Sequence, residues 1–128
     1  MTFSYKEMGA GFFVELEYSA QKILIAKIWE DLKSDNTQPL IQDESKATYW
    51  EGRTPFDGAI NSSMTLSEVD RLVRATTHPY PGAFFKSEGK EIIIWEGQLI
   101  KPGNDLPFKE IQLSDGIYYC TDFSYGNE

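Results

Sequence analysis

The spacing of hydrophobic residues predicts a long helix near the start of the chain. From Phe12 to about Lys33, apolar residues recur every three or four positions, which is the spacing of one helix face. Four more apolar residues fall off that stripe: Phe13, Val14, Ile25 and Trp29. The helix therefore has more apolar surface than one contact face needs, and we expect two packing partners for it.

A second, shorter helix is predicted after a polar stretch. Thr65 and Glu68 are spaced as a capping box. In this motif the Thr65 side chain accepts from the backbone N–H of Glu68, and the Glu68 side chain accepts from the backbone N–H of Thr65. The apolar stripe of this helix is formed by Leu66, Val69, Leu72, Val73 and Thr76. The polar residues Asp70, Arg71 and Arg74 fall on the other side. Pro79 ends the helix, because the residue before a proline is pushed out of the α region.

The second half of the chain alternates in the manner of strands. The turn residues Glu88-Gly89 and Asp115-Gly116 predict two hairpins, and we expect a bulge at Gly97. The predicted strands are Ala83 to Ser87, Lys90 to about Ile100, Lys109 to Leu113 and Ile117 to Thr121. The tail from Asp122 to Glu128 is predicted to fray.

These elements predict an α+β fold: a long helix, a linker, a short capped helix and a small antiparallel, OB-like β-barrel. Four strands are too few to close a barrel comfortably. Either residues 40–50 supply a further strand, or the barrel is incomplete. We expect a helical segment over residues 1–40, a linker over 41–64 and the helix with the β domain over 65–128.

Charge and cysteine content narrow the classes of function. The formal net charge is −8, which argues against a nucleic-acid surface or an anionic membrane as partner. Cys120 is the single cysteine, so neither an intrachain disulfide nor a cysteine-rich metal site is possible, and a cytoplasmic location is expected. No apolar run is long enough to span a bilayer, and the N-terminus lacks the features of a secretory signal.

Few residues in the sequence suggest chemistry. The single histidine, His78, is predicted at a helix end and is expected to have a structural role there. Neither common phosphate-binding loop is present. The most suggestive polar cluster runs from Arg53 to Gly58. There Arg53 either binds a phosphate or carboxylate or contacts Asp57 and stiffens the turn.

Three stretches in a fixed order resemble the C-terminal part of the formyltransferase family. They are QDESKATYWEGRTPFDGAI, then LVRATTHPYPGAF, then IIIWEGQLI. That family includes methionyl-tRNA formyltransferase and the nucleotide-sugar N-formyltransferases. The matching residues are Ser45, Ala47, Thr48, Tyr49, Arg53, Thr54, Pro55, Asp57, Gly58, Arg74, Ala75, Pro79, Tyr80, Pro81, Gly82, Ala83, Phe84 and Trp95. The resemblance extends from about Gly9 to Ile117, with the stretches in the same order as in the family. The long helix resembles the last helix of the family's catalytic domain.

The chain also departs from the family pattern. Phe56 stands where the family usually has Glu, and Asn61-Ser62 where it often has Asp-Trp. The family's catalytic Asn, His and Asp lie in an upstream domain whose motif is absent from this sequence, and His78 is not that histidine. The resemblance therefore implies a fragment, a split subunit or a degenerate copy with no catalytic residue of its own. No metal site is expected, because one histidine offers too few ligands. The resemblance leaves open whether the chain takes part in an enzyme.

Within the family, the acidic charge favours the accessory domain of a sugar N-formyltransferase over a tRNA-binding protein. The resemblance implies 10-formyltetrahydrofolate as formyl donor for a complete family member only, with no cofactor bound by this chain. Tyr49, Trp50 and Arg53 are the candidate substrate-binding residues. A stand-alone binding or assembly module and a methionyl-tRNA formyltransferase fragment are the alternatives. The expected partner is a second copy or a catalytic formyltransferase domain, with neither nucleic acid nor membrane.

Overall fold

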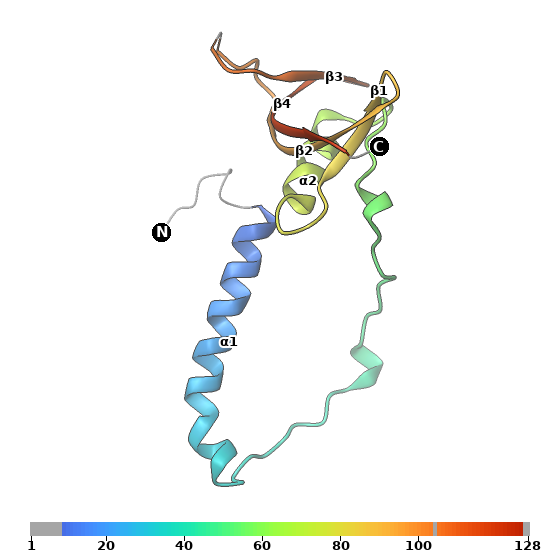
Figure 1. The fold of residues 1–128 in the computed structure, drawn as a ribbon. Coiled ribbons are helices and arrows are strands. Elements are labelled where there is room, and N and C mark those ends of the chain that lie inside the picture. Colours follow the sequence, from blue (N-terminus) through green and yellow to red (C-terminus); the bar gives the residue numbers. More distant parts are fainter. Residues whose placement is uncertain (1–8, 104, 127–128) are drawn as a thin grey trace. The chain divides into compact units, whose positions relative to one another are not determined.

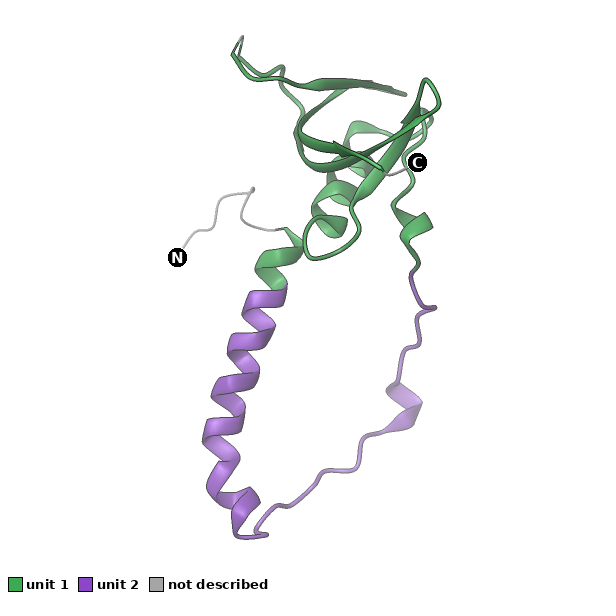
Figure 2. Cartoon of the chain, in the orientation of Figure 1, with its two compact units in different colours: residues 1–13, 54–128 green, residues 14–53 purple. Residues whose placement is uncertain are grey.

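The computed structural model describes residues 9–103 and 105–126. They form two compact units, coloured separately in Figure 2. One unit comprises the described residues up to Phe13 and those from Thr54 onward, and the other is Val14–Arg53. Along the chain the elements are α1 (Ala10–Lys33), two short 3-10 helices, α2 (Leu66–Thr76) and four strands (Figure 1).

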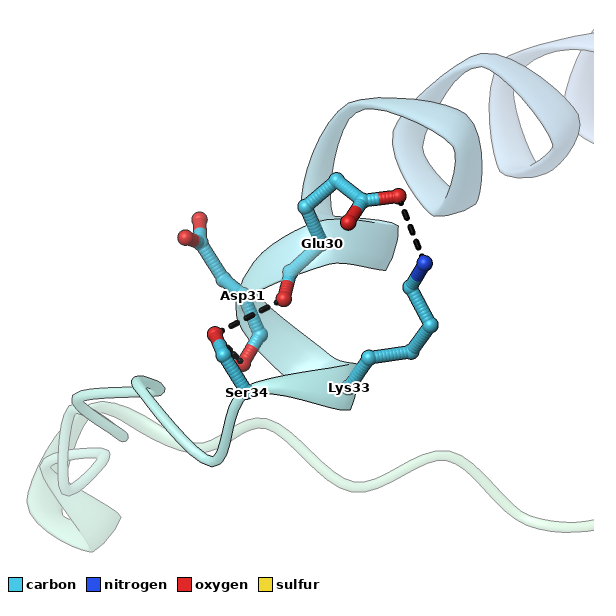
Figure 3. A network of polar contacts seen from close by, with 4 residues as sticks. All are labelled: Glu30, Asp31, Lys33 and Ser34. Carbon is cyan, nitrogen blue, oxygen red and sulfur yellow. Dashed lines mark hydrogen bonds and ion pairs between the residues drawn. The ribbon is translucent and has the colours of Figure 1, made fainter.

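The long helix predicted from the apolar spacing is α1. It begins at Ala10, two residues before the predicted start, and ends at Lys33. The end is fixed by local contacts: Asp35 takes a positive φ of 54°, and the Asn36 N–H donates to the Asp31 carbonyl at 3.0 Å. This is the bonding pattern of a Schellman motif. Figure 3 shows the side chains at this end, where Lys33 pairs with Glu30 at 2.8 Å.

The unit Val14–Arg53 has no core of its own. Every side chain from residue 15 to residue 53 is exposed. The segment after α1 is extended apart from the 3-10 helix η2 (Glu44–Lys46). The prediction that residues 40–50 could supply a strand is therefore wrong, and the sheet has four strands in the described part of the chain. Without a paired neighbour, this polar segment gains no ladder hydrogen bonds to hold it as a strand.

The other unit is built on an antiparallel sheet of order β1-β2-β4-β3. The strands are β1 (Ala83–Ser87), β2 (Lys90–Gln98), β3 (Lys109–Leu113) and β4 (Gly116–Tyr125). The sheet curls without closing, so the fold is an α+β fold with an incomplete OB-like barrel. Both predicted hairpins are present. The first turns at Glu88-Gly89 as predicted, whereas the second turns at Ser114-Asp115, one residue before the predicted Asp115-Gly116, because Gly116 pairs with Leu113. β2 shifts register on either side of Glu96, which confirms a bulge near Gly97.

The predicted frayed tail is wrong for the described residues up to 125. β4 continues through Asp122 to Tyr125 and pairs with β2, with Tyr125 opposite Ile92 and Phe123 opposite Ile94. The pairing is stable because Ile92 and Ile94 are buried, and a strand beside them satisfies their backbone groups. Residues 127 and 128 of the predicted tail lie outside the described residues.

Helix α2 covers one face of the curled sheet and completes the core. Its capping box is present as predicted: the Thr65 N–H donates to Glu68 Oε2 at 2.8 Å, and the Glu68 N–H donates to Thr65 Oγ1 at 3.3 Å. These bonds fix the start of the helix and turn its apolar stripe toward the strands. The core consists of Ile60, Val69, Val73, Ala83, Ile94, Ile111, Leu113, Tyr118 and Cys120.

Candidate functional site

The three predicted substrate-binding residues lie on the extended segment before η3 (Pro55–Gly58). Tyr49 and Trp50 have 85% and 83% of their surface exposed, and Arg53 is exposed as well. The Tyr49 hydroxyl donates to Glu44 Oε2 at 3.1 Å. Two aromatic rings and a guanidinium therefore face solvent within five positions of one another.

Short polar motifs shape the chain on both sides of these residues. Before them, the Asp43 carboxylate accepts hydrogen bonds from the hydroxyl and the N–H of Ser45, at 2.6 and 3.1 Å. These hydrogen bonds hold the pKa of Asp43 below its usual range. After them, the Asp57 carboxylate accepts from the N–H and the hydroxyl of Thr54, at 2.6 and 3.2 Å. The carboxyl of Asp57 thus orders the turn beside Arg53 through Thr54.

Among the hollows in the described part of the sheet unit, two concern the candidate site. The first, here called the helix cavity, has a volume of about 500 Å³ and lies between α2 and the end of β2. An ion pair lines it: Arg74 Nε lies 3.1 Å from Asp70 Oδ2, and only 5% of Asp70 is exposed. The sequence pattern had placed Asp70 on the polar side of the helix. The structure buries it, because Arg74 one turn later supplies a charged partner.

A close approach between β2 and β4 forms another part of the lining of the helix cavity. Tyr118 is completely buried and lines the cavity beside Gly97. A Cβ on Gly97 would lie 2.5 Å from both Cζ and Oη of Tyr118, so only glycine lets the ring pass over the bulge. Nearby, the Thr77 hydroxyl donates to the Trp95 carbonyl at 2.9 Å.

His78 occupies a structural position, as the sequence predicted. Its ring stacks on the indole of Trp95, with centroids 4.0 Å apart and planes 12° from parallel. The Trp95 indole N–H in turn donates to Ser124 Oγ at 3.0 Å. These contacts tie the end of α2 to β2 and β4.

Cys120 also behaves as expected from the sequence. It is buried in the core, and burial raises the pKa of its thiol to about 12. The thiol therefore stays protonated and unreactive at neutral pH.

The second hollow, here called the edge groove, has a volume of about 600 Å³. It lies between β1 and β3, the two edge strands of the sheet, and the segment before α2 borders it. The lining residues are Ala59, Ile60, Asn61, Ser62, Phe84, Phe85, Lys86, Ser87, Glu110, Ile111 and Gln112.

Tyr49, Trp50 and Arg53 line neither hollow. The structure places them close together on one exposed stretch. Sequence reasoning missed the Asp70–Arg74 pair, although an acidic residue four positions before an arginine on a helix was a usable signal. Among the described residues, no group of three or more His, Cys, Asp or Glu side chains could hold a metal ion.

Comparison with known proteins assigns the sheet unit to a family. Residues 53–115 match the family model for the formyl transferase C-terminal domain. The chain carries a formyltransferase C-terminal domain. The matched stretch begins at Arg53 and runs through α2 and the first three strands. It contains the helix cavity's ion pair and both strands that border the edge groove.

Two solved structures share the fold of this formyltransferase domain. Methionyl-tRNA formyltransferase from Clostridium thermocellum is 20% identical with a TM-score of 0.53, over 85% of this chain and 41% of that one. A variant of HypX from Aquifex aeolicus is 21% identical with a TM-score of 0.55, over 77% of this chain and 19% of that one. The chain thus spans less than half the length of either protein. In the described residues, no helix is both long and apolar enough to cross a membrane.

Proposed function

We propose that this chain is the accessory C-terminal region of a formyltransferase-like protein and works beside a catalytic domain that this sequence does not contain. One observation carries the proposal: every side chain from residue 15 to residue 53 is exposed, although many of them are large and apolar. Soluble monomers rarely expose contiguous apolar surface on this scale. A missing partner that covers α1 explains the pattern.

The exposed apolar residues lie all around α1. On one side are Leu16, Ile23 and Leu24, and on another are Ile25 and Trp29, each roughly half exposed. A helix that is apolar on several sides is normally buried in a larger structure. The match covers only 41% of the C. thermocellum formyltransferase. The remaining part of that protein is long enough to form a separate domain.

For the substrate, we propose a nucleotide-linked amino sugar formylated with 10-formyltetrahydrofolate. The net charge of −8 supports this choice over tRNA, because affinity for a polynucleotide depends on lysine and arginine neutralising its phosphates. No residue of this chain is assigned to the formyl donor, whose chemistry belongs to the catalytic domain. We place the protein in the cytoplasm, where a free buried thiol such as Cys120 remains reduced.

In this proposal Tyr49, Trp50 and Arg53 border the sugar-nucleotide side of the active site. An arginine fork suits a diphosphate, and the exposed rings of Tyr49 and Trp50 suit stacking on a base or packing against a sugar. All three are presented by a stretch whose neighbouring turns are ordered by Asp43 and Asp57. The three side chains would contribute to substrate binding and not to proton transfer.

A reconstitution assay tests the proposal. The purified full chain is added to a sugar N-formyltransferase catalytic domain that lacks its own C-terminal region, and formylation of a nucleotide-linked amino sugar is followed. We expect the chain to raise turnover, and Arg53→Ala to raise KM about tenfold or more while kcat changes little, since a charged hydrogen bond to a phosphate is lost. Lys101→Ala, which removes an exposed positive charge from a loop between β2 and β3, is the control.

Other outcomes of this assay separate the alternatives. If the chain binds the catalytic domain but Arg53→Ala acts like Lys101→Ala, the accessory role stands and the site assignment fails. If the chain neither binds that domain nor changes turnover, a stand-alone binding or assembly module becomes the better description. Tight binding of labelled tRNA that weakens steeply with salt would instead favour a methionyl-tRNA formyltransferase fragment.

A further inference from the structure

The edge groove is bordered on one side by β1, whose outer edge is bridged to Ala59 at Phe84 and has no backbone partner among the described residues at Lys86. Glu88 and Gly89 have φ values of 52° and 77°, as in a type I′ turn, so Ser87 and Lys90 form a hydrogen-bonded pair. Along an antiparallel pair of strands, hydrogen-bonded residue pairs alternate with pairs whose backbone N–H and C=O groups point away from the partner strand. The N–H and C=O of Lys86 therefore point away from β2. Phe84 has the same orientation, and its carbonyl accepts the Ile60 N–H at 2.7 Å.

The opposite side of the groove has the same property. β3 and β4 are joined by the two residues Ser114-Asp115, with Leu113 opposite Gly116. The same alternation turns the N–H and C=O of Glu110 and Gln112 away from β4. Since β1 and β3 are the two ends of the sheet order (Figure 1), neither edge pairs with the other. β3 presents the backbone groups of Glu110 and Gln112 to the hollow, and β1 presents those of Lys86.

The floor of the groove is apolar. Ile60 and Ile111 line it and also belong to the core. A groove with an apolar floor, the open edge of β3 and an open position at Lys86 on β1 has the features that bind an extended strand. Such edges are seldom left open in natural sheets, because they pair readily with another chain.

The chain contains an extended segment with the complementary features. Residues 37–42 belong to no helix or strand, and no described residue makes a backbone–backbone hydrogen bond with them. Leu40 and Ile41 in their middle are 92% and 94% exposed. Six extended residues span roughly 20 Å, which matches the roughly 17 Å of the five-residue strands β1 and β3.

We propose that residues 37–42 of a second copy enter the edge groove and add a strand to the sheet, and that the exchange is mutual. A second copy is favoured over the same chain because residues 37–42 are exposed and make no backbone hydrogen bond to any described residue of their own chain. Mutual exchange of one element gives a closed two-fold dimer. This inference does not depend on the proposed enzymatic role.

Cysteine cross-linking in mixtures tests the exchange between copies. One full-length chain carries Leu40→Cys or Ile41→Cys, and a second, differently tagged chain carries Lys86→Cys. The native Cys120 is buried and does not compete. Because side chains alternate between the faces of a strand, we expect one of the two mixtures to form the mixed disulfide several times faster than the other. Leu106→Cys, at an exposed apolar position outside the segment, is the matched control.

A proline substitution tests the edge itself. Lys86→Pro removes the outward N–H, and a proline is tolerated at such an edge position. Relative to Lys86→Ala, it should raise the dimer dissociation constant about three- to tenfold, measured by sedimentation. Leu40→Lys should raise it tenfold or more. Circular dichroism checks that each variant folds.

Three results would overturn the proposal. One is a chain that stays monomeric at millimolar concentration. Another is a dimer that Lys86→Pro and Leu40→Lys leave unchanged, which would place the interface elsewhere. The third is a doubly substituted chain, with cysteines at 86 and at 40 or 41, that forms only the intramolecular disulfide. That result would assign the strand to the same chain.

Discussion

The close approach of Tyr118 to Gly97 predicts a large loss of stability for Gly97→Ala. The new Cβ would lie 2.5 Å from Cζ and Oη of Tyr118, well inside van der Waals contact. The ring is completely buried, so it cannot swing into solvent to make room. Forcing an extra carbon into a packed core costs typically 1–3 kcal/mol. We expect about 2–3 kcal/mol here, since the obstacle is a rigid ring.

Thermal and urea unfolding followed by circular dichroism measure this loss. A loss of 2–3 kcal/mol corresponds to a fall in Tm of roughly 10–20 °C for a domain of this size. Gly103→Ala is the control, because a Cβ there meets nothing within 4 Å. Its stability should be unchanged or slightly raised. The Gly97→Ala loss should also shrink in a Tyr118→Leu background, where the ring is gone. Equal stability of Gly97→Ala and wild type would refute this packing argument.

Three further predictions concern α2. Thr65→Ala removes the cap of the helix and should lower the free energy of unfolding by about 1 kcal/mol in urea titrations; no change would mean that the cap is dispensable. The hydrogen bonds from Thr65 lower the pKa of Glu68 in the folded state, so its stabilising effect is present above the unfolded pKa and lost as pH falls through the folded pKa. Glu68→Gln should flatten the decline of stability on acidification. Finally, Arg74→Ala removes the ion-pair partner of buried Asp70 and should lower the free energy of unfolding by about 2 kcal/mol. The control Arg71→Ala, at an exposed position, should change it by no more than about 0.5 kcal/mol. Similar losses of stability for the two variants would argue against a role for the ion pair.

The sequence predicted the elements whose signals are local. The capping box at Thr65, the hairpin turn at Glu88-Gly89 and the bulge near Gly97 depend on residues a few positions apart, and the structure confirms each. The incomplete barrel was one of two options left open by the strand count. The structure selects it because residues 40–50 form no strand.

The errors concern contacts between residues distant in sequence. Residues 122–125 look like a polar tail, yet they form the last part of β4 because β2 lies beside them. Asp70 reads as a surface residue on a helical projection, yet its surroundings bury it. Tyr49, Trp50 and Arg53 were chosen by resemblance, and no local rule tells which surface they face. Their role stays a prediction for the same reason.

The central claim is that the formyl-transfer site lies outside this chain. Calorimetric titration of the purified full chain with 10-formyltetrahydrofolate, followed by a nucleotide-linked amino sugar, tests it most directly. The account predicts no saturable heat with the folate, whether or not the sugar nucleotide is present. Stoichiometric folate binding would contradict it, because the donor site would then lie within these 128 residues.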